Sequence, residues 1–140
     1  LIMHPTALPS KYGIGDFGST SREFIDFLEE TSTNIWQVLP LGLTSLDEFS
    51  PYSSPSSILG NRYLIDIEQL DGFENKNYKI ENFSNEYVEY KKVYDFKDLV
   101  FKDLSQTINP YDEIYQKIVS SLERFEFVKR LDKFFSRKVK

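Results

Sequence analysis

Cysteine is absent from this chain of 140 residues, and histidine occurs only once, at position 4. The lack of cysteine excludes disulfide bonds, thiolate catalysis and zinc–thiolate sites, and the single His4 excludes a metal site built from several histidines. No apolar run approaches the roughly 18 residues of a membrane-spanning helix, and no secretory signal is recognisable. We therefore expect a soluble cytoplasmic protein that uses no metal or cofactor and binds no membrane.

Positive charge is also scarce. The chain has 17 basic and 22 acidic residues, which gives a net charge of −5 at pH 7. A general nucleic-acid-binding protein needs a basic face that displaces counterions, so we expect no nucleic-acid partner. Residues 124–140 are locally basic, and a solvated helix face explains this charge more simply than an anionic partner does.

Aromatic side chains are abundant, with twelve phenylalanines and nine tyrosines. The hydrophobic share of 40% and the charged share of 28% are typical of a soluble globular protein. Most of the rings are expected in the core, and a few tyrosines are candidates for the wall of a ligand groove.

The first 41 residues show a strand–helix–strand pattern. The apolar segments Leu1–His4 and Ile35–Leu41 have strand-like composition, and Arg22–Glu30 between them has helical spacing. Thr20 followed by Glu23 is a capping-box pattern, which predicts where the helix begins. The apolar stripe of this helix consists of Phe24, Phe27 and Leu28. We predict one βαβ unit with parallel strands and a right-handed crossover.

The remaining chain is predicted to form a loop, a short strand, a connector and two helices. The loop covers residues 42–62, the strand is "YLIDI" at residues 63–67, and a polar connector follows. The first helix carries apolar residues between Tyr87 and Leu104, and the second begins near Asn109-Pro110. A (β/α)8 barrel needs roughly 200 residues or more, so the chain could supply only its opening strands.

The loop contains the stretch "SPYSSPSSILGNRYLID", from Ser50 to Asp66. Loops rich in serine and proline are usually connectors, but an exposed Tyr52 and a Gly60-Asn61 corner are also typical of a binding loop. From the residues alone, both interpretations stay open.

Standard catalytic motifs are missing from the sequence. The segment "GIGDFG" at residues 13–18 has the glycine spacing of a dinucleotide-binding loop, but a proline-rich segment separates it from the preceding strand. Asp47 and Glu48 lie in a predicted loop, and Asp66 is expected to cap the turn that follows it. No two carboxylates are placed for acid–base catalysis on a sugar. The residues alone therefore predict a candidate binding loop and no catalytic machinery.

Three sequence blocks together carry a resemblance to a known enzyme family. The blocks are "HPTALPSKYGIGDFG", "IWQVLPLG" and "SPYSSPSSILGNRYLID". In this order and near this spacing, they resemble the N-terminal part of the 4-α-glucanotransferases, which are the amylomaltases or disproportionating enzymes of glycoside hydrolase family 77. The resemblance is firm from Leu1 to Asp71 and weaker up to Leu104.

The resemblance implies an α/β fold: the N-terminal portion of a (β/α)8 TIM barrel, incomplete in this chain and followed by helices. It makes Leu1–His4 the first barrel strand and Ile35–Leu41 the second. Residues 1–72 would then hold the first strands and the active-site loop, and residues 73–140 a helical insertion or subdomain.

The resemblance also implies an activity. Members of the family transfer segments of an α-1,4-glucan between maltodextrins, with retention of configuration and through a glycosyl-enzyme intermediate. Their aspartate nucleophile, glutamate acid/base and second aspartate lie on later barrel strands, so no catalytic residue is expected within these 140 residues. The implied partners are a maltodextrin substrate and the remainder of the barrel.

Finally, the resemblance assigns a role to the loop. In the family, the Ser-Pro-Tyr turn borders the sugar subsite beside the scissile bond, which places Ser50 and Tyr52 there and lets Gly60 and Asn61 support the loop. Residues 43–49 depart from the family pattern, so the second glucan-binding site of some members is not carried over. A non-catalytic carbohydrate-binding piece and a degenerate, truncated gene product remain as alternatives.

Overall fold

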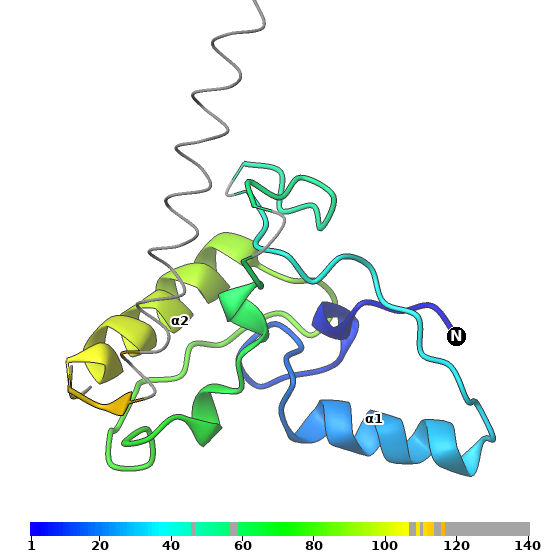
Figure 1. The fold of residues 1–140 in the computed structure, drawn as a ribbon, viewed down its shortest axis with the longest axis horizontal. Coiled ribbons are helices and arrows are strands. Elements are labelled where there is room, and N and C mark those ends of the chain that lie inside the picture. The colour runs from blue at the N-terminus through cyan, green and yellow to red at the C-terminus, as the bar shows by residue number, and fades with distance from the viewer. Residues whose placement is uncertain (46, 57–58, 107–108, 110, 114–115, 117–140) are drawn as a thin grey trace, which may run out of the picture. The chain divides into compact units, whose positions relative to one another are not determined.

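The computed structural model describes residues 1–45, 47–56, 59–106, 109, 111–113 and 116. The chain divides into two units, Leu1–Leu104 and Ser105–Lys140, and almost all described residues belong to the first. The described elements are, in chain order, η1 (Pro5–Ala7), α1 (Ser19–Glu30), η2 (Arg62–Leu64), η3 (Ile67–Gln69) and α2 (Tyr90–Ser105), where η denotes a 3-10 helix (Figure 1).

Both helices predicted within the first unit are present, with shifted ends. α2 begins at Tyr90, and the segment from Tyr87 that was predicted to open it is not helical. The second predicted helix, from Asn109, lies outside the described residues apart from isolated positions. No helix of the described part is long and apolar enough to cross a membrane.

The start of α1 differs from the predicted capping box. The N-cap is Gly18, which has no side chain to form a capping hydrogen bond, so the prediction based on Thr20 and Glu23 is wrong. Asp16 organises this end of the helix instead. Its Oδ1 accepts a hydrogen bond from the Gly18 N–H at 3.0 Å, and its carbonyl accepts one from the Ser21 hydroxyl.

The apolar stripe of α1 is only partly covered. Leu28 is buried, and the Phe24 ring meets the Trp36 ring edge-to-face at 5.0 Å. Phe27 stacks on Phe24 with ring centroids 6.1 Å apart and is 53% exposed. Phe27 is therefore in the predicted apolar stripe but is not buried.

The two N-terminal apolar segments pair in parallel, as predicted. Ile2 and Gln37 form a parallel bridge, in which the Gln37 N–H donates to the Leu1 carbonyl at 2.8 Å and the Met3 N–H donates to the Gln37 carbonyl at 3.1 Å. Within the described residues this bridge does not extend into continuous strands. Two parallel strands without further neighbours have little to stabilise them, which accounts for the short pairing.

The predicted strand "YLIDI" is wrong. These residues fall instead in and between η2 and η3, whose N-caps are Asn61 and Asp66. The Oδ1 of Asn61 accepts from the Tyr63 N–H at 3.0 Å, and that of Asp66 accepts from the Glu68 N–H at 3.1 Å. Such local side-chain caps compete with strand pairing, so the apolar composition alone misled the prediction. The expected capping role of Asp66 is confirmed.

The core of the first unit lies between α2 and the irregular segments. One buried cluster consists of Tyr12, Ile67, Phe96, Val100 and Leu104. The other consists of Ile14, Tyr63, Val93 and Tyr94. Both clusters join α2 to residues before position 72, so α2 packs on the segment that precedes it. The predicted functional division between residues 72 and 73 stays a prediction.

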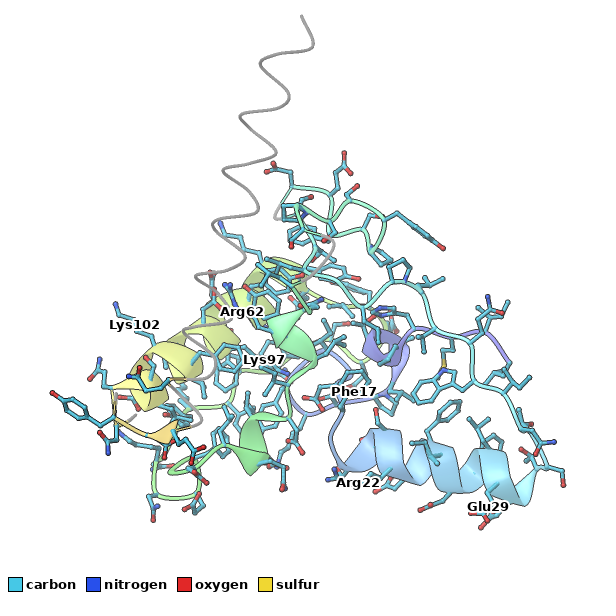
Figure 2. All side chains as sticks on the ribbon, viewed as in Figure 1. Phe17, Arg22, Glu29, Arg62, Lys97 and Lys102 are labelled. Carbon is cyan, nitrogen blue, oxygen red and sulfur yellow. The ribbon has the colours of Figure 1, made fainter. Side chains whose placement is uncertain are left out.

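A lysine is completely buried in the middle of this core (Figure 2). Lys97 of α2 donates from its Nζ to the Asp16 carboxylate at 2.9 Å, and to the carbonyls of Tyr63 and Ile65 at 2.8 and 2.9 Å. All three ammonium hydrogens thus have an acceptor. Burial lowers the pKa of Lys97 and raises that of Asp16, and the attraction between the two groups opposes both shifts.

Removing this buried lysine should destabilise the first unit strongly. We expect Lys97→Met to lower the free energy of unfolding by about 3 to 5 kcal/mol, because Asp16 would remain buried without its cation. Denaturant unfolding followed by circular dichroism measures the change. Lys91→Met, at an exposed position of the same helix, is the matched control and should change stability by less than about 0.5 kcal/mol.

The double variant Asp16→Asn/Lys97→Met separates loss of the pair from loss of packing. We expect it to be more stable than the sum of the single effects, with a coupling of about 0.5 to 3 kcal/mol. Strict additivity, or a Lys97→Met variant as stable as the control, would contradict the role given to the pair.

Candidate functional site

The candidate binding loop is closed at its base by backbone hydrogen bonds. Gly42 and Gly60 form an antiparallel bridge, and the Leu43 N–H donates to the Leu59 carbonyl at 3.0 Å. The Asn61 N–H donates to the Leu41 carbonyl at 2.8 Å. Gly60 and Asn61, the two predicted supporting residues, therefore stand where the loop leaves the rest of the unit.

Arg62 adds a side-chain link between the loop base and α2. Its guanidinium contacts both carboxylate oxygens of Asp98, at 3.0 and 2.8 Å, and donates to the Tyr63 hydroxyl at 2.8 Å. Two parallel bonds of this kind fix orientation as well as distance. The sequence analysis gave Arg62 no role, and the structure shows that it joins the loop base to α2.

The Ser-Pro-Tyr segment forms a tight turn. The Ser53 N–H donates to the Ser50 carbonyl at 3.1 Å, and the Ser50 hydroxyl accepts from the Tyr52 N–H at 3.3 Å. Pro51, at the second position of the turn, fixes one backbone dihedral. The Ser45 N–H also donates to the Ser53 carbonyl at 3.0 Å, which ties the end of the turn to the opposite side of the loop.

This turn presents Tyr52 to solvent. Its side chain is 72% exposed, whereas Ser50 is half-buried. An exposed phenol ring can lie against the apolar face of a sugar, and a serine hydroxyl can both donate to and accept from sugar hydroxyls. The structure thus puts the two predicted site residues on one turn, and their role in sugar binding stays a prediction.

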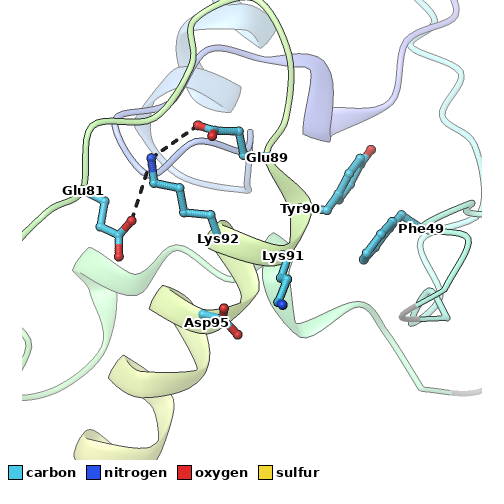
Figure 3. A pocket seen from close by; sticks show the side chains of 7 residues that line it. All are labelled: Phe49, Glu81, Glu89, Tyr90, Lys91, Lys92 and Asp95. Atoms are coloured by element: carbon cyan, nitrogen blue, oxygen red, sulfur yellow. Dashed lines mark hydrogen bonds and ion pairs between the residues drawn. The ribbon is translucent and has the colours of Figure 1, made fainter.

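The residue before the turn was missed by the sequence reasoning. Phe49 has a backbone φ of 53°, and its ring stacks on that of Tyr90 with centroids 4.8 Å apart and an interplanar angle of 8° (Figure 3). The same ring meets Tyr94 edge-to-face at 5.6 Å. The sequence feature that could have identified Phe49 is its place directly before Ser-Pro-Tyr, at a position where the chain departs from the family pattern.

Tyr94 holds the loop at a second point. Its hydroxyl lies 2.8 Å from that of Thr44, and both side chains are buried. Its ring stacks on Tyr63 with centroids 3.6 Å apart. Burial raises the pKa of the Tyr94 hydroxyl, so this group stays protonated and able to donate.

A hollow of about 510 Å³ lies beside this contact (Figure 3). Its wall combines aromatic rings with charged side chains, and Lys92 lies 3.8 Å from Glu81 and 3.5 Å from Glu89. The lining residues are Phe49, Glu81, Glu89, Tyr90, Lys91, Lys92 and Asp95. Neither Ser50 nor Tyr52 lines this hollow, so it is separate from the predicted subsite.

The glycines of residues 13–18 serve packing. Gly13 has a φ of +76°, which favours glycine, and a side-chain carbon on Gly15 would lie only 2.1 Å from the Pro5 carbonyl oxygen. The carboxylate in this segment, Asp16, is bound to Lys97. These contacts account for the glycine spacing without a bound nucleotide.

The other acidic side chains considered at the sequence level also have structural positions. Asp47 and Glu48 are exposed, and Glu48 accepts a hydrogen bond from the Ser53 hydroxyl within the loop. Asp66 caps η3. Among the described residues no group of three or more histidine, aspartate or glutamate side chains could hold a metal ion.

The solved structures include a relative of similar fold. The amylomaltase from Streptococcus agalactiae, solved in complex with acarbose, matches with a TM-score of 0.71 and 32% sequence identity. The match covers 90% of this chain and 26% of that one. The class of protein is therefore the amylomaltase class, of which this chain corresponds to a part.

Sequence comparison identifies the family. The 4-alpha-glucanotransferase family profile, glycoside hydrolase family 77, matches residues 3–133. The 4-alpha-glucanotransferase of Clostridium butyricum is 39% identical over 116 residues, which cover 79% of this chain and 24% of the relative. That of Thermus thermophilus is 50% identical over 70 residues, which cover 50% of this chain and 14% of the relative. The chain belongs to the 4-alpha-glucanotransferase family and spans about a quarter or less of the length of these relatives.

The single histidine provides a test of the N-terminal packing. The His4 Nδ1 lies 2.7 Å from the Thr6 hydroxyl, and burial lowers its pKa below the ordinary value of 6.5. A lowered folded-state pKa means that protonation favours unfolding. The stabilising contribution is therefore complete above about pH 6.5 and is lost as the pH falls. We expect the unfolding free energy to drop more between pH 7.5 and 5.5 than it does in His4→Asn.

Asparagine is the matched replacement because it can also cap η1, which His4 precedes. An NMR titration of the one histidine signal gives an independent readout. A midpoint at or above 6.5 in the folded chain would contradict the lowered pKa that follows from the half-buried position of the ring.

Proposed function

We propose that this chain is the N-terminal segment of a 4-α-glucanotransferase. The whole enzyme would transfer segments of an α-1,4-glucan between maltodextrins, with retention and through a glycosyl-enzyme intermediate. Family membership over residues 3–133 and the structural match to an amylomaltase in complex with acarbose support this proposal. In the same proposal the protein acts in the cytoplasm and uses no cofactor.

The parallel bridge between Ile2 and Gln37 supports the assignment of the segments around them to the first two strands of a (β/α)8 barrel. Parallel strands joined through a helix, here α1, are the repeating unit of that fold. The remainder of the barrel would come from chain beyond these 140 residues. The proposal gives that remainder the catalytic carboxylates as well.

The functional proposal rests mainly on the exposed Tyr52. This residue lies on a turn that is closed by its own backbone hydrogen bond and bound to the opposite side of the loop through Ser45 and Ser53. Barrel enzymes build their sites from the loops that follow the strands, and this loop follows the second proposed strand. Within the loop, Ser50 offers a hydroxyl and Tyr52 an exposed ring, which suits a glucose unit of a maltodextrin. We assign these two residues to a sugar subsite.

Alone, the 140-residue chain should not disproportionate maltotriose. A retaining transfer needs a nucleophilic carboxylate and an acid/base placed about 5 to 5.5 Å apart across the sugar, and the proposal puts both beyond residue 140. Glucose release from maltotriose is the measurement, with the Clostridium butyricum relative as the active control. Glucose release above the buffer rate, from chain freed of host enzymes, would contradict the proposal that the catalytic carboxylates lie outside these 140 residues.

Tyr52→Ala tests the subsite in a full-length enzyme whose N-terminal segment is this chain. We expect kcat/KM for maltotriose to fall by the equivalent of about 1 to 3 kcal/mol, the scale of one lost pocket contact. The melting temperature should change little because the ring is exposed. Tyr87→Ala, which removes a ring of similar exposure outside the loop, is the control and should leave kcat/KM unchanged.

The opposite pattern, a large loss of stability with unchanged kinetics, would make Tyr52 a packing residue. The loop would then be a connector, and the proposed subsite would be wrong.

A further inference from the structure

We propose that Phe49 is the positioning residue of the subsite: its ring, held on α2, fixes the direction in which the Ser50–Ser53 turn presents Tyr52. This inference rests on the proposed function, because it concerns the same loop. It assigns a role to a residue that departs from the family pattern and that the sequence alone did not single out.

The backbone of Phe49 provides the first argument. Its φ of 53° lies in the left-handed region, which a bulky side chain adopts rarely and at an energetic cost. Such a conformation persists only where the surroundings impose it. The residue that follows is the first of the turn, so the unusual dihedral at Phe49 sets the course of the chain into Ser50.

The ring of Phe49 supplies the constraint. It lies parallel to the Tyr90 ring at 4.8 Å (Figure 3) and meets the Tyr94 ring edge-on at 5.6 Å. Two rings of one helix therefore contact it in two different orientations. Aromatic pairs in these arrangements stabilise contacts beyond the area that they bury. The Phe49 N–H also donates to the Ser45 carbonyl at 3.1 Å, which constrains the backbone of the same residue.

The platform under Phe49 is itself well held. The Tyr94 hydroxyl meets that of Thr44 at 2.8 Å, and its ring stacks on Tyr63. Lys97, one helical turn further along α2, is bound to Asp16 and to two carbonyls. The two residues of α2 that contact the Phe49 ring therefore belong to a helix with several fixed contacts of its own.

Loss of the Phe49 ring should leave the turn closed but allow it to move relative to α2. Its internal hydrogen bonds join Ser50 to Tyr52 and Ser53, and none of them uses the Phe49 side chain. Tyr52 would then have to be ordered during sugar binding. That cost should weaken binding by about three- to tenfold, the range expected for fixing one mobile side chain.

The experiment is NMR on the full 140-residue chain, with backbone order parameters and a maltoheptaose titration. In Phe49→Ala we expect the order parameters of Tyr52 and Ser53 to fall from about 0.85 toward 0.6, and the Kd for maltoheptaose to rise three- to tenfold. Phe49→Tyr keeps the ring and should restore both values. Phe49→Gly relieves the backbone strain without a ring and should behave like the alanine variant. Tyr87→Ala is the control and should change neither value.

The two readouts separate the two proposals. If maltoheptaose fails to shift Tyr52 in the unaltered chain, the proposed subsite is wrong, while the order parameters still test whether Phe49 positions the turn. If the unaltered chain binds and Phe49→Ala changes neither the order parameters nor the Kd, the positioning role of Phe49 is wrong and the subsite stands.

Discussion

The hydrogen-bonded pair of Lys97 and Asp16 connects three parts of the first unit that lie far apart in the sequence. Lys97 comes from α2, Asp16 from the glycine-containing segment before α1, and the two carbonyls that Lys97 also binds come from the stretch around η2. A charged group that is buried away from water needs a hydrogen-bond acceptor for each of its donors. Each of the three ammonium hydrogens of Lys97 has one. These directional hydrogen bonds define the position of α2 more narrowly than apolar contacts alone would. The same carboxylate accepts from the N–H of Gly18, the N-cap of α1, so the anchor of α2 also organises the start of α1.

The candidate binding loop depends on this anchor through a chain of contacts. Tyr94 lies about one turn before Lys97 on α2, and it meets both Thr44 at the beginning of the loop and Phe49 directly before the exposed turn. Arg62 and Asp98 add a link at the loop's end. The helix therefore contacts the loop at its beginning, middle and end. α2, which follows the predicted division between residues 72 and 73, thus contacts the loop that precedes this division.

Local patterns predicted the parts of the fold that local forces determine. The helical spacing of residues 22–30 predicted α1, and the cap at Asp66 follows from a side chain that bonds an N–H two residues on. The parallel pairing of the first segments was also predictable, because a helix connects them. The strand at residues 63–67 was not, because the apolar pattern is the same for a strand and for the capped turns that formed. The roles of Lys97 and Phe49 could not be found in this way. A lysine in a helix usually faces water, and the groups that the two side chains contact lie more than 30 residues away in the sequence.

Several large apolar side chains beside the parallel bridge remain exposed, and the proposed barrel gives them a physical context. Leu1, Ile2 and Ile35 are exposed by 55%, 65% and 73%. Parallel sheets are stable when both faces are covered, so apolar residues on such strands need neighbouring strands and helices. In a closed barrel, side chains of one face fill the interior and those of the other meet the helices. Phe27 of α1 is also about half exposed, so this helix too has an apolar side chain that a neighbouring element of the barrel could cover. The exposed apolar side chains at the segments proposed as strands are therefore the ones that neighbouring strands and helices of a closed barrel would cover.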